Sequence, residues 1–531
     1  MIEFALTLVS LVIWLYLLGF RGQFWLSDQI LDDSTTDIKD FPPICAVIPA
    51  RNEAELLPVT LKSLLSQNYP GSFQIILVDD GSTDNTANVA KNIAQELNKT
   101  EQLQVISGKP LPPSWTGKLW AMQQGIEYAS NLQPSSKYLL LTDADIVHDA
   151  NNLHRLVAQA ESESLDLVSL MVRLRCESFW EKLLIPAFIF FFKKLYPFRW
   201  VNNPQKLTAA AAGGCILIRQ ESLTRIGGIQ VVRNALIDDC ALAKAVKLGN
   251  SGNNRQVATN NLANSQLKNE QHSLQNDAFS VANLEANISN NTLDNSNFSQ
   301  VVNKNLDIST ENQQCFSNNL TNFQEENEQN FLPNQQSLIS NENLEYSGFF
   351  QDLNLDDLPN NQQFFPNNLA NFQPEKEQQT LQNIQSPIPN PQQGRIWLGL
   401  TEKTASLRAY TSLNSIWSMV TRTAFTQLNY SIWLLLGTVF GMTLIYLVPP
   451  LGVIWGIITK NELVTITAFL AWLLMSIAYF PTIRFYRLSS LWAFSLPIIA
   501  FLYTIMTIDS ARCHWQGRGG GWKGRIYPQI E

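Results

Sequence analysis

Apolar and polar positions alternate along the first half of the chain in two different periods. Short apolar runs typical of buried strands cover residues 44–50, 74–80, 103–108 and 137–145. Stretches with apolar residues three or four positions apart, as in helices, cover residues 51–67, 86–97 and 118–130. Strands that alternate with helices in this way predict an α/β domain with a mostly parallel sheet.

Longer apolar stretches lie near both ends of the chain. Residues 3–20 are almost wholly apolar, are followed by Arg21 and lack a small-residue cleavage site, which predicts a retained membrane anchor. A signal peptide is the alternative. Three further apolar stretches cover residues 432–458, 463–480 and 491–508, and Pro449-Pro450 interrupts the first. The pattern therefore predicts a multi-pass membrane protein.

Two other segments are expected at the membrane surface. Residues 183–192 are too short to span a bilayer and end at Lys193-Lys194, which favours an interfacial or re-entrant piece. Residues 415–433, which contain Arg422, have the mixed character of an amphipathic interfacial helix.

The segment 251–393 differs from both kinds of region. Asn, Gln, Ser and Glu dominate it without a sustained apolar period, so it cannot bury enough apolar surface to offset chain entropy. Similar stretches begin at Asn260, Asn318 and Asn367. A solenoid would need regularly spaced copies with a core pattern, which these lack, so we expect a disordered insert.

The net charge of −8 is unevenly distributed. Residues 250–393 hold 16 acidic and 4 basic side chains, so the remainder of the chain is mildly basic, as suits a surface facing anionic lipid. The six cysteines are scattered, and no pair has C-x-x-C spacing. This usage supports neither a zinc site nor a disulfide framework, and it fits a reducing compartment.

Pairs of carboxylates follow two of the predicted strands. Asp143 and Asp145 end YLLLTDAD, and Asp79 and Asp80 end QIILVDD. In open α/β sheets, ligands bind at the carboxyl ends of the strands. An extended D-x-D points both carboxylates the same way, and such oxygen ligands suit Mg²⁺ or Mn²⁺. The alternative is turn and cap chemistry, for which Asp is common at strand ends.

Six stretches, taken in order, carry a family resemblance. They are VIPARNEA, ILVDDGSTDNT, GKLWAMQQGI, LLTDAD, AAGGCILIRQESLTRIGG and LIDDCALAKAVKLG. As an ordered set they resemble glycosyltransferase family 2, which has the GT-A fold, over residues 44–249. Three later stretches, GRIWLGLTEKTASLR, MVTRTAFTQLNYS and MTIDSARCHWQGRGGGWKGRIY, look like the membrane-bound subgroup called hopene-associated glycosyltransferases.

The resemblance implies where a nucleotide-sugar donor binds. Pro49 and Glu53 match a loop that cradles the base, and Asp79 and Asp80 match the pair that holds uracil and ribose. Lys118 matches a basic residue near the nucleotide-sugar, although an exposed helix lysine would show the same pattern.

The resemblance also implies the metal site and the base. Asp143 and Asp145 match the motif that binds Mg²⁺ or Mn²⁺ and the donor diphosphate, and Asp239 matches the catalytic base. Its neighbour Asp238 either contacts the substrate or is an acid that starts a helix. The apolar spacing after these two acids predicts a helix start, whose dipole and N–H groups keep a carboxylate ionised. Such a base takes the acceptor proton while the diphosphate leaves from the opposite face, which inverts the anomeric carbon.

The C-terminal tail bears on the outcome of this chemistry. Processive polysaccharide synthases of the family carry Q-x-x-R-W, and its absence here favours transfer of one sugar per acceptor. Trp522 and Arg525 are candidates for stacking on a base and contacting phosphate. A basic segment that rests on anionic lipid is the alternative. A processive synthase and a non-catalytic membrane scaffold remain as other function classes.

Membrane topology follows in part from charge. Arg21 and a nucleotide-sugar donor both place the catalytic domain in the cytoplasm, at the inner (plasma) membrane. Three later spans would put the basic tail outside, against the positive-inside tendency. Either Pro449-Pro450 divides its stretch into a hairpin, or one C-terminal segment does not cross.

The expected partners are a nucleotide-sugar, with a UDP-sugar favoured, a lipid acceptor such as a hopanoid or other polyisoprenoid, and the membrane. No nucleic acid is expected. The expected regions are an N-terminal transmembrane anchor (1–21), a GT-A glycosyltransferase domain (40–250), the disordered insert (251–393), the end of the catalytic domain with an interfacial helix (394–430), transmembrane helices (431–510) and a basic tail (511–531).

Overall fold

The computed structural model describes residues 1–31, 40–249 and 393–518, together with the backbone of 521–522 and 525–526. The predicted insert lies outside the described residues except at its last position. The side chains of Trp522 and Arg525 also lie outside them, so the two alternatives for the tail both stay predictions. The described segments before and after the insert belong to one compact unit.

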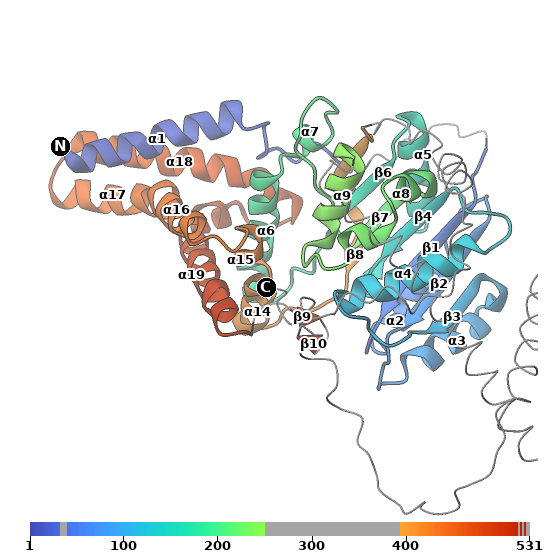
Figure 1. The fold of residues 1–531 in the computed structure, drawn as a ribbon. Coiled ribbons are helices and arrows are strands. Elements are labelled where there is room, and N and C mark those ends of the chain that lie inside the picture. The colour runs from blue at the N-terminus through green and yellow to red at the C-terminus, as the bar shows by residue number, and fades with distance from the viewer. Residues whose placement is uncertain (32–39, 250–392, 519–520, 523–524, 527–531) are drawn as a thin grey trace, which may run out of the picture. The chain divides into compact units, whose positions relative to one another are not determined.

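An eight-stranded mixed sheet forms the centre of the soluble part (Figure 1). In spatial order its strands are β3 (Leu103–Ser107), β2 (Phe73–Asp79), β1 (Ile44–Ala50), β4 (Tyr138–Thr142), β7 (Cys215–Arg219), β6 (Leu167–Arg173), β8 (Ile396–Ser406) and β5 (Ile146–Val147). The first four are parallel, β7 is antiparallel to both neighbours, and β8 is parallel to β6. The predicted α/β class with a mostly parallel sheet is confirmed.

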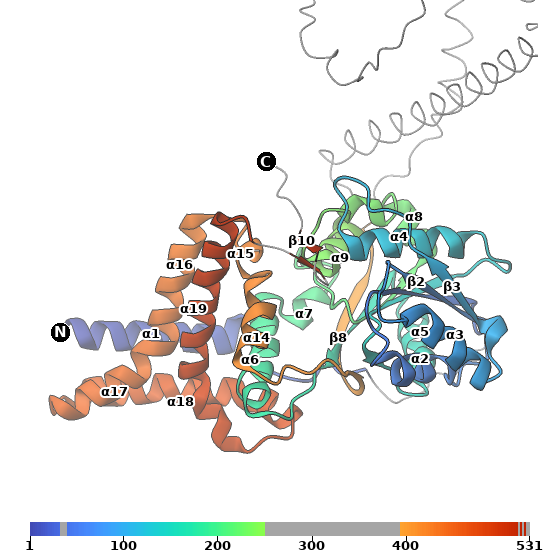
Figure 2. The ribbon, with the colours of Figure 1, turned by 90° about the horizontal axis from the view of Figure 1, so that it is seen from below.

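Helices cover both faces of this sheet (Figure 2). One face carries α2 (Leu57–Leu65), α3 (Thr86–Glu96) and α5 (Asn152–Ser162), and the other carries α4 (Gly117–Ser130), α8 (Gln220–Arg225) and α9 (Asp238–Leu248). Strand β1 shows the cause, because Ile44 and Ala46 pack into one hydrophobic cluster while Cys45 and Val47 pack into the other. Both faces are buried, which is why the strand is apolar at every position except its proline.

Helix α6 (Phe179–Leu195) joins the sheet domain to the apolar helices. Ile185 and Ile189 pack into the core of the sheet domain, whereas Leu184 and Phe190 pack against the apolar helices. Apolar residues all round a helix favour burial on every side. The segment predicted as an interfacial or re-entrant piece is therefore largely enclosed by protein.

The remaining short elements are η1 (Thr100–Gln102), α7 (Phe198–Val201), η2 (Ile229–Val232), α14 (Leu413–Thr421), α15 (Ala424–Gln427), β9 (Gly521–Trp522) and β10 (Arg525–Ile526). The segment predicted as one interfacial helix with Arg422 forms the two helices α14 and α15, and Arg422 ends the first of them.

Four helical segments of the described chain are long and apolar enough to cross a membrane. They are α1 (Ile2–Phe20), the run 432–458 made of α16 (Ile432–Met442), η4 (Thr443–Leu447) and α17 (Val448–Ile458), α18 (Glu462–Phe485), and the run 490–515 made of η5 (Ser490–Ser495) and α19 (Leu496–Trp515). In the second, a π-helical turn precedes Pro449-Pro450, and α16 and α17 point in different directions (Figure 2).

The apolar helices do not form one parallel bundle. Helices α1, α17 and α18 pack against one another, whereas α19 packs against α14 and α16. In both views α19 runs across α18 rather than along it (Figures 1 and 2). Trp14 ties the N-terminal helix to the η4 turn, because its indole N–H donates to the carbonyl of Ile445 (2.9 Å).

Candidate active site

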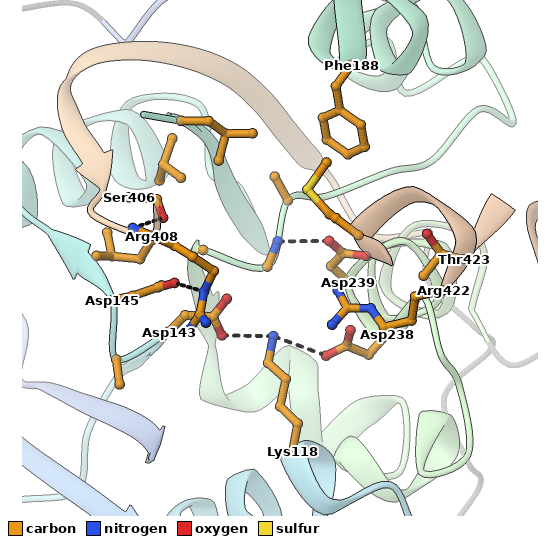
Figure 3. Close-up of a pocket in the computed structure, with 18 of the residues that line it drawn as sticks. Lys118, Asp143, Asp145, Phe188, Asp238, Asp239, Ser406, Arg408, Arg422 and Thr423 are labelled. Carbon is orange, nitrogen blue, oxygen red and sulfur yellow. Dashed lines mark hydrogen bonds and ion pairs between the residues drawn. The ribbon is translucent and has the colours of Figure 1, made fainter. Parts of the chain in front are cut away.

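A cavity of about 520 Å³ opens where strands of the sheet end near α6 and α14. Its floor comes from the carboxyl ends of β1, β4, β6 and β8 and from the N-terminal turns of α4 and α9. Seven of the residues singled out from the sequence line it, namely Pro49, Glu53, Lys118, Asp143, Asp145, Asp238 and Asp239. Figure 3 shows Lys118 and the four aspartates of this set converging from several elements.

The D-x-D pair lies in a turn, not in an extended strand. Strand β4 ends at Thr142 and β5 begins at Ile146, so Asp143 and Asp145 occupy the connection between them. The expectation of two carboxylates aligned by strand alternation is therefore wrong, because the chain turns at this point. Both side chains nonetheless line the cavity.

Each carboxylate of the pair is neutralised by a different cation of the chain. Asp143 Oδ1 lies 2.8 Å from Lys118 Nζ, and Asp145 Oδ2 accepts a hydrogen bond from Arg408 Nε at 2.7 Å (Figure 3). Burial and the nearby Asp143 raise the pKa of Asp145, an effect that Arg408 opposes. The pair is thus close enough to repel, and the two cations hold it together.

Lys118 bridges the two acid groups of the site. It lies in the first turn of α4, where the Thr116 hydroxyl accepts the Leu119 N–H as an N-cap. Its ammonium also lies 3.6 Å from Asp238 Oδ2, and only 17 % of its side chain is exposed. Burial by itself would lower the pKa of Lys118, but Asp143 and Asp238 raise it above its usual value. The side chain is a fixed cation of the cavity, not a solvent-facing lysine.

Asp239 is held by backbone donors at the start of α9. The Gly213 N–H donates to its Oδ2 (2.8 Å), and the Cys240 N–H donates to its Oδ1 (2.7 Å). A Cβ at Gly213 would lie 3.2 Å from Lys118 Nζ and 3.4 Å from Asp239 Oδ2, so a glycine permits this close approach.

The surroundings of Asp239 shift its pKa upward. Loss of solvation and the neighbouring Asp238 raise its pKa to about 6, although Lys118 and the backbone donors oppose the shift. The backbone donors at the helix start favour the ionised form, as the sequence predicts, but burial has the larger effect on the pKa. A carboxylate with a pKa near 6 is still mostly ionised at neutral pH, and it is a stronger base than an exposed one.

The residues expected to hold the nucleoside are only partly brought to the cavity. Asp79 Oδ1 accepts the Ser82 N–H (3.1 Å), and Asp80 is buried beside Arg51, whose Nη1 lies 3.7 Å from Asp80 Oδ2. Neither acid lines the cavity. Glu53 lines the cavity and forms an ion pair with Arg408 at 3.0 Å.

Arg408 is the main site residue that sequence reasoning missed. It follows β8, 263 positions after Asp145 and 355 after Glu53, and joins both. A sequence signal existed, since an arginine two positions after the strand-like run IWLGLTEKTAS falls near a strand end, where the acids of this sheet also lie.

A buried polar network supports the turn from behind. His148 bonds to Thr142 Oγ1 (3.0 Å) and Asn152 Nδ2 (3.0 Å), Thr142 donates to the Gly214 carbonyl (2.8 Å), and Thr404 donates to Asn152. Burial lowers the pKa of His148 to about 3, so the ring is neutral. The network links β4, α5 and β8 and thereby fixes the positions from which the D-x-D and Arg408 project.

The charge of the cavity fits a divalent cation together with an anionic ligand. Among the described side chains that line it, five carboxylates outnumber three cations; the carboxylates are Glu53, Asp143, Asp145, Asp238 and Asp239, and the cations are Lys118, Arg408 and Arg422. No group of three His, Cys, Asp or Glu residues that could hold a metal occurs in the described chain. Mg²⁺ commonly binds through one or two carboxylates and completes its shell with water and phosphate, so Asp143 and Asp145 suit it.

The opposite wall of the cavity is apolar on α6 and mixed on α14, where Ser415, Ser418 and Arg422 line it beside Met419. Phe188 and Phe192 of α6 and Met419 of α14 line it, and Phe188 and Met419 also pack against the cluster formed by the apolar helices. Asp239 lies between this wall and the D-x-D (Figure 3).

The sheet, its helices and the acids at its strand ends define the class of this domain as a GT-A-like α/β fold. Residues 45–227 match the family model described as Glycosyl transferase family 2. No comparison identifies the hopene-associated subgroup.

Named relatives match this domain only in part. They include 4,4'-diaponeurosporenoate glycosyltransferase of Staphylococcus haemolyticus (33% identical over 119 residues, 22% of this chain and 28% of the relative). Dolichyl-phosphate beta-glucosyltransferase of Saccharomyces cerevisiae is 32% identical over 132 residues, 23% of this chain and 37% of its own. Undecaprenyl-phosphate 4-deoxy-4-formamido-L-arabinose transferase of Proteus mirabilis is 29% identical over 141 residues, which are 26% of this chain and 40% of the relative. The chain thus spans less than half the length of each.

Among solved structures, a mannosyltransferase from Pyrobaculum calidifontis in complex with GDP-Man and Mn²⁺ is similar with a TM-score of 0.35 and 20% identity. The match covers 46% of this chain and 63% of that one.

Proposed function

We propose that this chain is a membrane-bound glycosyltransferase that moves one sugar from a nucleotide-sugar to a lipid acceptor. The observation that carries the proposal is the composition of the cavity. One wall holds the D-x-D acids, the α6 side of the other is apolar, and Asp239 lines the same cavity across from the D-x-D. A charged donor and an apolar acceptor would thus meet at a carboxylate suited to take a proton.

The donor side fits a diphosphate held with a divalent cation, Mg²⁺ or Mn²⁺. Asp143 and Asp145 would hold the ion, which when bound neutralises charge on the leaving diphosphate. We assign the base of the donor, with uridine favoured, to the loop of Pro49 and Glu53 and to Asp79 and Asp80. Neither of these two acids lines the cavity, so their part in holding the base is tested by uridine binding to Asp79→Asn and Asp80→Asn variants.

Asp239 is proposed as the general base. Two backbone N–H groups hold its carboxylate in place, so little reorganisation is needed when it accepts a proton. The acceptor oxygen would attack the anomeric carbon as its proton passes to Asp239, while the bond to the diphosphate breaks on the far side. This single displacement inverts the anomeric centre and leaves the transferred proton on Asp239.

The acceptor is proposed to be a lipid that attacks through a neutral hydroxyl. A hydroxyl needs a base, whereas a lipid phosphate is already ionised and would be repelled by the excess of carboxylates in the cavity. The apolar wall of α6 and α14 suits a hydrocarbon body. A hopanoid or another polyisoprenoid alcohol meets both conditions.

The proposed location is the inner (plasma) membrane, with the catalytic domain in the cytoplasm. If α1 and α18 cross the bilayer, α19 lies closer to its plane, because it runs across α18 (Figure 2). One C-terminal segment then does not cross, and the basic tail stays on the cytoplasmic side. An impermeant maleimide should label Cys513 only in opened vesicles, whereas a Thr459→Cys variant at the α17–α18 turn should react from outside.

The function is tested with purified protein in membranes, labelled UDP-sugars, Mn²⁺ and extracted lipids. Label that enters the lipid phase with the parent protein, and not with Asp239→Asn, supports the proposal. Label in polymer would instead indicate a processive synthase. No transfer with any nucleotide-sugar would leave the non-catalytic scaffold as the function.

A further inference from the structure

We propose that Arg408 is a donor-binding residue that links the two loops of the donor site through Asp145 and Glu53 and turns to the diphosphate when the donor arrives. The inference rests on the proposed function, since it assumes a nucleoside diphosphate donor. It assigns a role to a residue outside the family domain match, which ends at residue 227.

The contacts of Arg408 join two separate loops. Its Nε lies 2.7 Å from Asp145 Oδ2, in the turn after β4, and its Nη2 lies 3.0 Å from Glu53 Oε1, in the loop after β1. The two carboxylate side chains are only 9 % and 8 % exposed, whereas that of Arg408 is 36 % exposed. The guanidinium therefore has access to the cavity while its partners are enclosed.

The backbone of Arg408 is fixed independently of its side chain. The N–H of Leu407 donates to the carbonyl of Asp145 (2.9 Å), and strand β8 pairs with β5 through Ser406 and Ile146. The guanidinium can thus exchange partners without movement of the strand that carries it. It would stay within reach of anything bound beside Asp145.

Charge makes such an exchange favourable. A divalent cation at the D-x-D would compete with the guanidinium for Asp145, since both need the same carboxylate. A diphosphate at the same place would offer Arg408 new acceptors, and the planar guanidinium fork suits phosphate oxygens. When metal and diphosphate bind together, the metal takes Asp145 from Arg408 and the diphosphate gives Arg408 new acceptors. When metal binds alone, Arg408 loses Asp145 and gains no acceptor in return.

This exchange separates Arg408 from the structural ion pairs of the fold. Arg155 with Asp149, and Arg175 with Glu181, are charge pairs whose members do not line the cavity. A ligand bound in the cavity would therefore not compete for the members of those pairs. Arg408 alone among the described arginines pairs with a D-x-D carboxylate.

The test compares Arg408→Met with Arg487→Met. Arg487, which follows α18, pairs with Glu402 of β8 on the exposed surface, so its variant is a matched control. Binding of Mn²⁺ alone is followed by electron paramagnetic resonance, and binding of UDP with Mn²⁺ and of uridine is followed by calorimetry.

In Arg408→Met we expect Mn²⁺ alone to bind severalfold more tightly, because its competitor is gone. We expect UDP to bind about tenfold more weakly or worse, as for loss of a charge-assisted hydrogen bond, with uridine unchanged. Arg487→Met should match the parent in all three. If the methionine variant does not fold, Arg408→Lys keeps the charge but loses the fork, and should show a smaller loss for UDP with the same sign.

The outcomes separate the two proposals. A parent protein that binds UDP, with Arg408 variants that bind UDP and Mn²⁺ as the parent does, overturns the role of Arg408 alone. Equal losses for UDP and uridine also overturn it, since they would mean a general disturbance of the site. A parent that binds no nucleoside diphosphate with Mn²⁺ overturns the proposed function, and the inference with it.

Discussion

The two walls of the cavity are built on different principles. The sheet-side wall concentrates charge, and its acids come from strand ends and helix starts that backbone hydrogen bonds hold in place. The helix-side wall carries Phe188, Phe192 and Met419 on α6 and α14, two helices that also contact the apolar helices. Reaction at the charged wall thus depends on side chains held in fixed positions, whereas binding at the apolar side chains depends on their shape and on the apolar surface that they bury. Changes in the two walls should therefore alter different measured quantities.

Removal of divalent metal should have the largest effect on the charged wall. We expect EDTA to abolish transfer, because the cavity has an excess of carboxylates and would repel a diphosphate without a counter-ion. Asp145→Ala should weaken UDP binding in Mn²⁺, measured by calorimetry. Full turnover in EDTA would contradict this role of the D-x-D.

Replacement of the base should have the next largest effect. Asp239→Asn removes the proton acceptor but keeps a side chain of similar size, so transfer should fall by about 10²-fold or more. UDP binding should stay close to that of the parent. Asp238→Asn is the matched control, and a larger loss in that variant would mean that the neighbouring acid is the base.

The pH profile should report the raised pKa of Asp239. Below about pH 6 this carboxylate becomes protonated and can no longer accept the acceptor proton, so the rate should fall as the pH drops through this value. The measurement is kcat/KM for the lipid acceptor against pH, because this ratio follows the pKa of the base before the acceptor binds. A rate that stays constant down to pH 4.5 would place the kinetically important base elsewhere.

A change in the apolar wall should affect the lipid and leave the donor alone. Phe188→Asn should raise KM for the lipid acceptor by about tenfold, because an apolar contact in the cavity is lost. The binding of UDP should not change. Phe179→Asn, at an exposed position of the same helix, serves as the control and should match the parent.

Deletion of the insert should have the smallest effect on either wall. The Gly394 N–H donates to the Val246 carbonyl (3.2 Å), so the chain leaves and re-enters the domain at adjacent points. Deleting Ser251 to Gln393 and joining the ends with a short Gly-Ser linker should therefore preserve the fold, since loop entropy changes slowly with length. Thermal melting and transfer assays check this, and loss of folding would mean that the insert packs against the domain.

The sequence by itself determined which elements form and where the acids lie along them. Apolar periodicity located β1, β2, β3 and β4 and the helices between them, because burial of a strand or a helix face leaves a local pattern. The same reasoning placed the D-x-D at the end of the fourth strand, although that strand stops at Thr142, and placed Asp239 at the start of a helix. It set one boundary too early, since α2 begins only at Leu57 after the loop that carries Glu53.

Only the tertiary structure decided how these groups act on one another. Arg408 meets Asp145 and Glu53 across 263 and 355 positions, a separation over which no periodic pattern carries information. The direction of the pKa shift of Asp239 was also out of reach, since loss of solvation depends on which segments enclose the carboxylate. Local patterns encode secondary structure, but charge pairing and desolvation act over a few ångströms of space, and the fold alone determines which residues share that space.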